Sequence, residues 1–478
     1  MGFFDHCQPN RRFNAYSSET FPEGPTTWHT IDWDQRRYIS TSVPEEVDVD
    51  DGGEEVEERI IQSLAGIVDQ LDADVNLVNF SIEGDLISTS SDAKDDSAQA
   101  PLYCPIDMIP AQYRRGCVVS RADLVEIDRL SQCVDLVSYR SQPGSRAVFK
   151  YQFHHNQVLR NWHELNCWMR LSGHPNIVPM DCLVTDYAEV PNHGIVEVVV
   201  GFTSVFVPGM TLQDNPSRVF KLKYLEQLIE VVDDINLKFG IVHQDIAPRN
   251  LLINPITDTL QLFDFSCAGK LGWGGASEDQ RLFGNSGSFK FDLMGVVATM
   301  YEIITRDTQL AEQVLLCADM STIEEKEWVK HPDVVLDKEV SHYRQTLRSW
   351  LKRRSQPENL ITHYTQAPSP MEWPQSWRPE LPWLDQDGNP LGESSPCSSV
   401  RRAALKALGL KFVEWERPAH NKIPNGFRVL GNGTLVAQKD LQTGGNYPGI
   451  GKGCDLATKA CKFLRQSMNN RKVLCAMW

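Results

Sequence analysis

The chain of 478 residues lacks the cysteine patterns that mark several common protein classes. Its 12 cysteines include no Cys-x-x-Cys pair and no regular alternation with histidine. This spacing argues against a structural zinc site and against a small disulfide framework. We therefore expect most of the cysteines to be reduced, buried apolar residues of an intracellular protein.

Long hydrophobic runs are missing as well. The most apolar stretch, residues 195–207, contains Glu197 and is too short to span a bilayer. The first dozen residues include Asp5, His6 and two arginines, which interrupt any signal-peptide pattern. Together these absences predict a cytoplasmic or nuclear protein that does not contact a membrane.

Basic charge is in deficit, and the deficit is confined to one end of the chain. Residues 1–118 hold 23 Asp and Glu against 8 Lys and Arg, whereas the other 360 residues hold 40 and 39. No segment provides the basic face that nucleic acid requires, so we expect no nucleic-acid partner. Residues 45–58 carry nine carboxylates and no base. Such a run predicts a largely disordered acidic leader over residues 1–118, suited to a basic partner, with one amphipathic helix near 57–75.

From about residue 119 the sequence changes to clear strand and helix patterns. Strands come first and helices later, which predicts an α+β fold in two lobes, a β-rich N-lobe at about 119–207 and a mainly helical C-lobe at about 208–355. The turn between the first two strands is expected at Pro143-Gly144, and the second helix is expected to end at Gly240. The individual elements are strands at 134–139, 147–153 and 194–207, and helices at 158–171 and 222–235.

The C-terminal part divides into three segments. Residues 356–398 are rich in Pro and Trp, which predicts an extended arm packed on the preceding domain through its tryptophans. Residues 399–443 predict a short helix and a hairpin that turns at Gly431-Asn432-Gly433. Residues 444–478 are basic and weakly patterned, and we expect a flexible tail.

Two short segments in the second lobe carry candidate chemistry. Residues 241–253 contain an apolar pair, then His243 and Asp245, and then Asn250 five residues after Asp245. Residues 260–266 form a short apolar strand that ends in Asp264. Each segment taken alone is a weak signal, but an apolar strand before each acid makes a chance combination a poor explanation.

These segments resemble the catalytic loop His-Arg-Asp-x-x-x-x-Asn and the metal loop Asp-Phe-Gly of the protein-kinase family. The resemblance implies that Asp245 orients an acceptor hydroxyl and takes its proton, and that Asn250 and Asp264 hold the magnesium of MgATP. Arg249 would replace the catalytic-loop lysine, because Ala247 stands at that lysine's position. The loop sequence His-Gln-Asp-Ile-Ala-Pro-Arg-Asn most resembles the catalytic loop of protein-kinase-like proteins of filamentous fungi.

The first lobe extends the resemblance. Ala147-Val-Phe-Lys150 resembles the strand that presents the ATP-binding lysine, and Glu164 lies ten residues before His174-Pro-Asn-Ile-Val178. In kinases this tract follows the regulatory helix, so the resemblance implies a Lys150–Glu164 ion pair that holds the lysine against the α- and β-phosphates. Taken alone, Lys150 is better explained as a solvated charge, and a surface helix carboxylate stays the alternative for Glu164.

Two further segments fit the same family. The segment from Val205 to Leu212 is similar to the kinase hinge, where backbone groups at Val205 and Val207 would meet adenine. Residues 291–305 resemble the central helix of the large lobe, with Asp292 bracing the catalytic loop. The resemblance covers about residues 124–351.

The sequence also departs from the kinase pattern at the phosphate loop. Gly144 is the only glycine between Gly116 and Gly173, so no glycine-rich loop covers the phosphates. Residues 130–136 occupy that place, and we expect side chains such as Asp135 to keep backbone amides away from ATP. This predicts weaker nucleotide binding than in an ordinary kinase.

Three other departures concern the metal loop, the catalytic loop and the segment that follows Asp264. Ser266 replaces the usual glycine, which restricts that loop. Gln244 replaces the arginine that grips a phosphorylated activation loop, so we expect no switching by phosphate at Ser277 or Ser286. The interval from Asp264 to Asp292 spans only 28 positions and lacks Ala-Pro-Glu, which curtails the platform for a peptide substrate.

We therefore expect a phosphotransferase of the protein-kinase type that uses ATP and Mg²⁺ and acts on Ser or Thr of a protein. A catalytically weak pseudokinase or nucleotide-binding scaffold is the first alternative, because the phosphate-loop glycines are missing. A small-molecule kinase of the aminoglycoside or choline type is the second, because it shares the His-x-Asp-x-x-x-x-Asn loop.

Overall fold

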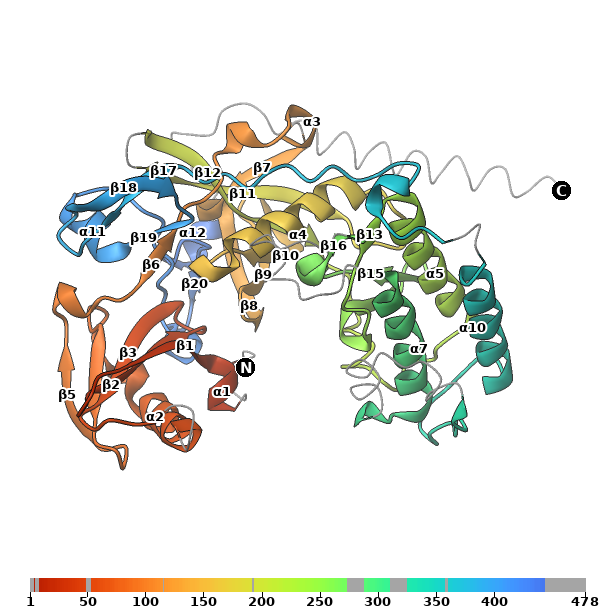
Figure 1. Ribbon diagram of the computed structural model, residues 1–478, viewed down its shortest axis with the longest axis horizontal. Helices are drawn as coiled ribbons and strands as arrows, with labels where there is room; N and C mark the ends of the chain where they lie inside the picture. Colours follow the sequence, from red (N-terminus) through yellow and green to blue (C-terminus); the bar gives the residue numbers. More distant parts are fainter. Residues whose placement is uncertain are drawn as a thin grey trace.

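Two large β-sheets, five two-stranded sheets and a group of helices make up the described part of the computed structural model (Figure 1). The structure describes residues 4, 8–48, 53–114, 116–190, 193–272, 288–309, 325–356 and 360–442. The two sheets lie on the left of Figure 1 and the helices α5, α7 and α10 on the right. The fold is thus mixed α and β, with β-rich and helical parts separated in space.

The first sheet lies in the segment that we expected to be disordered, so this prediction is wrong. Its five strands follow the order β1-β2-β3-β4-β5, and α2 connects β3 to the parallel strand β4. The elements are α1 (Pro9–Arg12), β1 (Phe13–Thr20), β2 (Thr26–Asp32), β3 (Arg37–Val43), α2 (Gly53–Ile67), β4 (Leu77–Phe80) and β5 (Leu86–Ser90). We call residues 8–98 the N-terminal module.

Two physical reasons explain why the acidic segment folds. Glu54 and Glu55 lie in the first turn of α2, where the positive end of the helix dipole stabilises carboxylates. The apolar face of α2 buries Ile60, Ile61 and Leu64 in a core shared with the sheet. The helix ends at Ile67, earlier than the expected residue 75. The acidity therefore belongs to a helix terminus and to loops, not to an unfolded leader.

The second sheet has six strands in the order β7-β11-β12-β10-β9-β8, with α4 packed against it. The helix α4 spans Val158–Leu171, as predicted. The strands are β7 (Cys117–Ser120), β8 (Leu124–Ser131), β9 (Val134–Tyr139), β10 (Gln142–Tyr151), β11 (Met180–Val190) and β12 (Gly194–Val205). A short helix, α3 (Ala111–Arg114), precedes them.

Two local predictions for this sheet need correction. The turn between β9 and β10 lies at Arg140-Ser141, and Pro143-Gly144 falls inside an irregular start of β10. Gly144 has φ +93°, a conformation that suits a bulge as well as a turn, so the pair was misassigned. Cys117 and Cys182, neighbours on β7 and β11, form a disulfide and are an exception to the expected reduced state.

The helical part follows the sheet through residues 206–221. The predicted second helix is α5 (Leu222–Asp233), which continues through one π-helical turn (Asp234–Lys238) and ends before Gly240, whose φ is +66°. Its apolar stripe is buried in the largest core. The other elements are β13 (Ile241–Val242), β14 (Leu251–Asn254), β15 (Thr259–Leu262), β16 (Gly269–Lys270), α7 (Phe289–Thr305) and α10 (Val340–Arg354).

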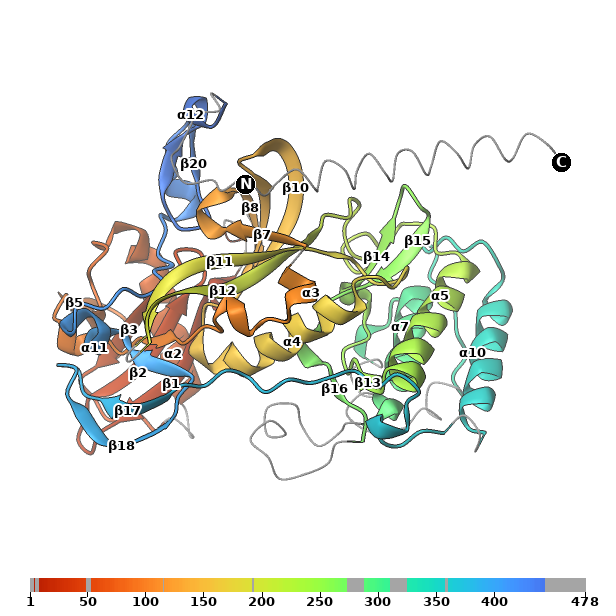
Figure 2. The same ribbon diagram turned by 90° about the horizontal axis from the view of Figure 1, so that it is seen from above.

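The C-terminal segment returns from the helical part to both sheets (Figures 1 and 2). It contains the predicted short helix and the predicted hairpin with its turn at residues 430–434, together with a second hairpin that Pro and Trp had concealed. The elements are β17 (Glu380–Leu384), β18 (Pro390–Pro396), β19 (Ser399–Arg401), α11 (Arg402–Ala407), β20 (Phe427–Val429), β21 (Leu435–Ala437) and α12 (Gln438–Gln442). Strand β19 pairs with β6 (Gln99–Pro101). The expected flexible tail, residues 444–478, lies outside the described residues.

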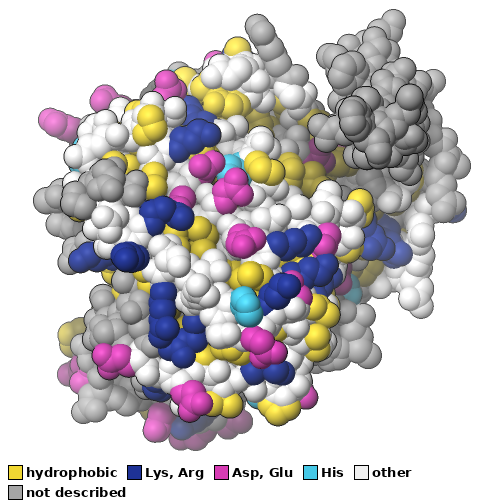
Figure 3. Space-filling model, turned by 90° about the vertical axis from the view of Figure 1, so that its right-hand side faces the viewer, with side chains coloured by type: hydrophobic (Ala, Val, Ile, Leu, Met, Phe, Trp, Pro, Cys, Tyr) yellow, Lys and Arg dark blue, Asp and Glu magenta, His cyan; other side chains and the backbone are white. Residues whose placement is uncertain are grey.

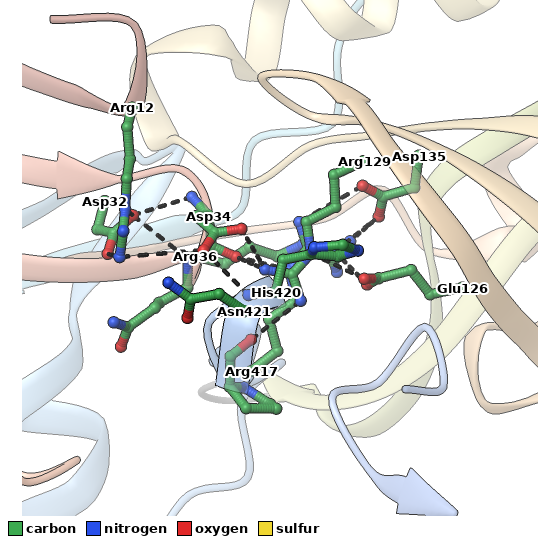
Figure 4. Close-up of polar contacts among 12 residues, drawn as sticks. Arg12, Asp32, Asp34, Arg36, Glu126, Arg129, Asp135, Arg417, His420 and Asn421 are labelled. Carbon is green, nitrogen blue, oxygen red and sulfur yellow. Dashed lines mark hydrogen bonds and ion pairs between the residues drawn. The ribbon is translucent and has the colours of Figure 1, made fainter. Parts of the chain in front are cut away.

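A buried group of charges joins the three parts that lie far apart in the sequence (Figure 4). Asp135 of β9 binds Arg36 of the N-terminal module and Arg417 of the C-terminal segment. All three side chains are at most 2 % exposed. We call the following residues the ion cluster: Asp34, Arg36, Glu126, Arg129, Asp135 and Arg417.

The described residues include no membrane-spanning helix, and the face drawn in Figure 3 has no continuous basic surface. None of the helices there is long and apolar enough to cross a bilayer. On the face of the helical part seen in Figure 3, Lys and Arg side chains are interspersed with Asp and Glu. That face therefore presents no continuous basic surface.

Candidate functional site

The candidate site is centred on Lys150, near the end of β10. Its Nζ lies 2.8 Å from Glu164 Oε1 on α4 and 2.7 Å from Asp264 Oδ1, just after β15. The expected ion pair with Glu164 is present, and Asp264 shares the same ammonium group. The Glu164 side chain is 1 % exposed, whereas those of Lys150 and Asp264 are 23 % and 31 % exposed. Lys150 and Asp264 are therefore partly accessible to solvent, whereas Glu164 is buried.

The three charges alter one another's ionisation. Burial alone would lower the pKa of Lys150, but the carboxylates of Asp264 and Glu164 outweigh it and raise that pKa. Burial would raise the pKa of Asp264, but Lys150 outweighs it and lowers that pKa. Burial raises the pKa of Glu164 to about 7, because the attraction of Lys150 offsets only part of the desolvation. Glu164 is thus the group of the three that titrates near neutral pH.

Asp264 is held in a left-handed backbone conformation with φ +63°. Its Oδ1 also accepts a hydrogen bond of 3.3 Å from the Ser266 amide, which fixes the carboxylate. The next residue, Phe265, is fully buried between Trp168 of α4 and His243, with ring centroids 5.9 Å and 5.0 Å away. With Phe265 packed beneath α4, the carboxylate of Asp264 points toward Lys150.

The second half of the site is the loop that contains Asp245, Arg249 and Asn250. Asn250 donates hydrogen bonds from Nδ2 to the Asp245 carbonyl at 2.8 Å and to Asp245 Oδ2 at 2.7 Å. Arg249, 55 % exposed, forms an ion pair with Asp245 Oδ1. The structure therefore brings these three predicted residues together on one loop.

Backbone contacts connect this loop to the strand that precedes Asp264. The Phe263 amide donates to the Asn250 carbonyl at 3.2 Å, and His243 Nε2 lies 3.2 Å from the Phe263 carbonyl oxygen. The two predicted motifs are thus neighbours, although 14 positions separate Asn250 from Asp264. Asp245, Asn250 and Asp264 belong to one connected site.

Asp292 of α7 braces the loop, as the resemblance implied. Its carboxylate accepts hydrogen bonds from the His243 amide at 2.9 Å, the Gln244 amide at 2.7 Å and Asn236 Nδ2 at 2.7 Å. A Cβ on Gly295, one turn later, would lie 2.8 Å from the Ile246 Cβ. The lack of a side chain at Gly295 lets α7 approach the loop closely.

The residues predicted to form a hinge lie at the end of β12, an interior strand of the second sheet. Val205 is the last residue of β12, pairs with Ala147 of β10 and is 42 % exposed. Val207, 6 % exposed, packs into the largest core. Their backbones run beside the strand that carries Lys150, which is where a purine contact is expected, and that contact stays a prediction.

The structure corrects one expectation about the phosphate loop. Asp135 points away from Lys150 and is bound in the ion cluster, so its side chain cannot hold amides away from a phosphate. The turn of this hairpin is nevertheless short, because it consists of Gln132-Cys133 alone, and Val134 directly after it pairs with Lys150. The tip thus ends beside Lys150 and provides no extended backbone cradle.

The oxygen donors present fit a magnesium ion that a nucleotide would bring. Because Nδ2 of Asn250 is bound to Asp245, the amide oxygen of Asn250 points to the other side. Asp264 uses Oδ1 for Lys150, which leaves Oδ2 as a hard donor. No group of three or more His, Cys, Asp or Glu in the described residues is arranged to hold a metal alone. Two protein oxygens are few for magnesium, which commonly takes its other ligands from phosphates and water.

Sequence reasoning missed three supporting contacts. Trp168 donates from Nε1 to Glu164 Oε1 at 3.3 Å and also covers Phe265. Asn176 donates to the Leu260 carbonyl at 2.8 Å and connects the His-Pro-Asn tract to β15. Gln244 donates to the Cys267 carbonyl at 2.9 Å. Only the spacing of Trp168 from Glu164, four residues on one helix, was a usable signal.

Comparisons with known proteins give limited similarity. No family model matches the chain. The curated protein named Glycogen synthase kinase 1 from Pyricularia oryzae is 34 % identical over 111 residues, 21 % of this chain and 26 % of that protein. The chain therefore matches about a quarter of the length of this relative. The solved structure of the Cydia pomonella granulovirus kinase PK-1 is similar at 18 % identity and a TM-score of 0.35, covering 51 % of this chain and 94 % of that one.

Proposed function

We propose that this chain is a phosphotransferase of the protein-kinase type that uses ATP and Mg²⁺, in a two-lobed domain at about 119–355. The observation that carries the proposal is the Lys150 ammonium group bound by both Glu164 and Asp264. The strand before Asp264 is bonded to the loop of Asp245 and Asn250. Charge neutralisation and positioning are the main requirements of phosphoryl transfer, and these residues supply both.

Each residue has a distinct role in the proposal. Lys150 leaves Asp264 to bind the α- and β-phosphates, while Glu164 keeps it in place. Asp264 and the amide oxygen of Asn250 hold magnesium, which neutralises charge on the phosphates. Asp245 orients the acceptor hydroxyl and takes its proton, and Arg249, bound to Asp245, stabilises that carboxylate and contacts the transferred group.

The acceptor is proposed to be a Ser or Thr hydroxyl of a protein. Gln244 supports transfer that does not depend on phosphate in the activation segment. Its neutral amide already binds the Cys267 carbonyl, a contact that connects the catalytic loop to the segment after Asp264. Ser277 and Ser286, the phosphorylation sites considered above, lie outside the described residues.

Two measurements on one pair of variants test the proposal. Thermal unfolding is followed with and without MgATP, and transfer of labelled phosphate to mixed protein acceptors is measured. We expect the wild type to show both stabilisation and transfer, and Asp245→Asn to keep the stabilisation but lose transfer by at least about a thousandfold. Asp258→Asn is the control, because it alters a half-buried carboxylate bound to Lys221, Lys223 and Tyr224 outside the candidate site and should change neither result. Transfer that survives in Asp245→Asn would contradict the assigned role.

The short turn between β8 and β9 favours a second candidate function, a nucleotide-binding scaffold with little or no phosphate transfer. This turn, at Gln132-Cys133, contains no glycine and ends at the level of Lys150. The same experiment separates the candidates, because a scaffold shows stabilisation by MgATP and no transfer in the wild type.

A further inference from the structure

The arm predicted from Pro and Trp begins at the helical part of the molecule. The Ser369 and Met371 amides donate to the Lys238 and Phe239 carbonyls, both at 3.0 Å. The Met371 side chain is 6 % exposed and belongs to the largest core. This end of the arm is therefore fixed to the segment after α5. We call residues 369–377 the strap.

From this anchor the strap runs alongside α4, in the opposite chain direction (Figure 2). Trp162 donates from Nε1 to the Pro374 carbonyl, and Asn166 donates from Nδ2 to the Glu372 carbonyl, both at 2.8 Å. The ring of Trp373 lies 5.2 Å from that of His163. Since residues four apart lie on one face of a helix, Trp162 and Asn166 present a single face to the strap.

The strap covers α4 on a side that the sheet leaves open. Eleven of the 14 residues of α4 are buried, among them Trp162 and Asn166 on the side of the strap and Trp168 on the side of the sheet. Ser376 and Trp377 also line the cavity that contains Lys150 and Glu164. The helix that carries Glu164 is thus enclosed between the sheet and the strap.

We propose that the strap holds α4 in the position in which Glu164 binds Lys150, with Trp162 and Asn166 as positioning residues. An outward shift of α4 by about 1 Å would break both hydrogen bonds and leave the indole N–H of Trp162 and the Nδ2 group of Asn166 without these acceptors. Because the strap is part of the same chain and is anchored to the helical part, this brace requires no partner protein. It deepens the proposed function, since it gives a physical basis for transfer that does not depend on activation-segment phosphate.

The test compares two variants that lose buried tryptophan hydrogen bonds in different places. Trp162→Phe/Asn166→Leu removes both side-chain donors to the strap. Trp350→Phe is the matched control, because Trp350 is 1 % exposed and donates to Asp233 Oδ1 at 2.9 Å within the helical part. Amide hydrogen exchange of residues 158–171 is measured on the full chain without nucleotide, and KM and kcat for MgATP are measured in parallel.

We expect α4 amides to exchange at least about tenfold faster in Trp162→Phe/Asn166→Leu and at the wild-type rate in Trp350→Phe. KM for MgATP should rise about tenfold with kcat retained, because nucleotide binding selects the competent position of α4. A general loss of stability would instead lower the active fraction and leave KM unchanged.

The strap proposal is overturned if α4 exchange is unchanged in Trp162→Phe/Asn166→Leu, or if Trp350→Phe accelerates it equally. Failure of the proposed function has a different appearance. A wild type that neither binds MgATP nor transfers phosphate, but shows the exchange difference, contradicts the phosphotransferase and supports the strap.

Discussion

The two faces of the six-stranded sheet show how differently neighbouring residues are used. Lys150 points toward α4 and Asp264, whereas Phe149 points to the opposite face and is fully buried beneath the C-terminal segment. On the next strand Val134 pairs with Lys150 and Asp135 pairs with Phe149. Because paired residues share a face and successive residues alternate, the Val134–Lys150 pair faces the candidate site and the Asp135–Phe149 pair faces the ion cluster and the C-terminal segment.

The two faces differ in which parts of the chain complete them. The α4 face is completed by residues of the domain itself and by the strap. The opposite face of the sheet, which carries the ion cluster and is called the outer face, depends on Arg36 from the N-terminal module and Arg417 from the C-terminal segment. A fragment limited to residues 119–355 would keep Glu126 and Asp135 but lose both of these arginines. We infer that the proposed activity belongs to the whole described chain.

The largest effect is expected when one arginine of the ion cluster on the outer face is replaced. Arg417→Met removes the partner of Glu126 and Asp135 and leaves two carboxylates buried with fewer counter-charges. We expect the free energy of unfolding to fall by about 3–5 kcal/mol, measured by urea denaturation. Arg428→Met, at an exposed position, is the control and should cost less than about 0.5 kcal/mol. Equal, small losses in both would show that the ion cluster is not needed for stability.

The inner face of the sheet, which carries Lys150, is tested by the pH dependence of the free energy of unfolding. The pKa of Glu164 is about 7 in the folded chain against 4.5 ordinarily, so the folded state binds more protons between these values. Stability contributed by the neutral form is therefore lost as pH rises through this window. Relative to Glu164→Gln, the wild type should lose about 2 kcal/mol of unfolding free energy between about pH 5 and 7.5. A constant difference between the two proteins across that range would contradict the assignment.

The contact between α7 and the catalytic loop is tested by Gly295→Ala. The added Cβ would lie 2.8 Å from the Ile246 Cβ and 3.1 Å from the Ile246 carbonyl oxygen. We expect a loss of about 1–3 kcal/mol in unfolding free energy and a larger fractional loss of transfer than of MgATP binding, since Asp245 adjoins Ile246. Gly173→Ala, where an added Cβ meets nothing within 4 Å, is the control. Unchanged transfer would show that α7 does not position the loop.

The smallest effect concerns the acidic run in the N-terminal module. Replacing Glu54 or Glu55 by Gln removes negative charge from the first turn of α2. Each replacement should destabilise the chain by about 0.3–1 kcal/mol, less at high salt, as measured by thermal unfolding. An increase in stability would support the view that repulsion among the carboxylates dominates there.

The sequence predicted the inner face better than the outer one for a physical reason. The spacings around Asp245, Asn250 and Asp264 are short, and each acid follows an apolar strand, so local pattern places them. The helix of Glu164 was likewise set by its own periodicity. The ion cluster joins residues separated by 99 and 282 positions, and a charged residue in an isolated segment reads as solvated until its partners are known.

The same limit explains the error at the N-terminal module. The strands there contain many Thr, Ser and aromatic residues, but the average charge of residues 1–118 concealed them. The strap was partly foreseen, since its tryptophans predicted packing. Its partners on α4 could not be identified, because Trp162 and Asn166 lie more than 200 positions before it.

The central claim is that Lys150, Asp264 and Asn250 form one site for a magnesium-bound nucleotide. Calorimetric titration of ATP into the wild type and into Asp264→Asn, with and without Mg²⁺, tests it most directly. We expect the wild type to bind ATP at least about tenfold more tightly with Mg²⁺ than without, and Asp264→Asn to lose this difference. Magnesium-dependent binding that survives in Asp264→Asn, or no binding to the wild type at all, would contradict the account.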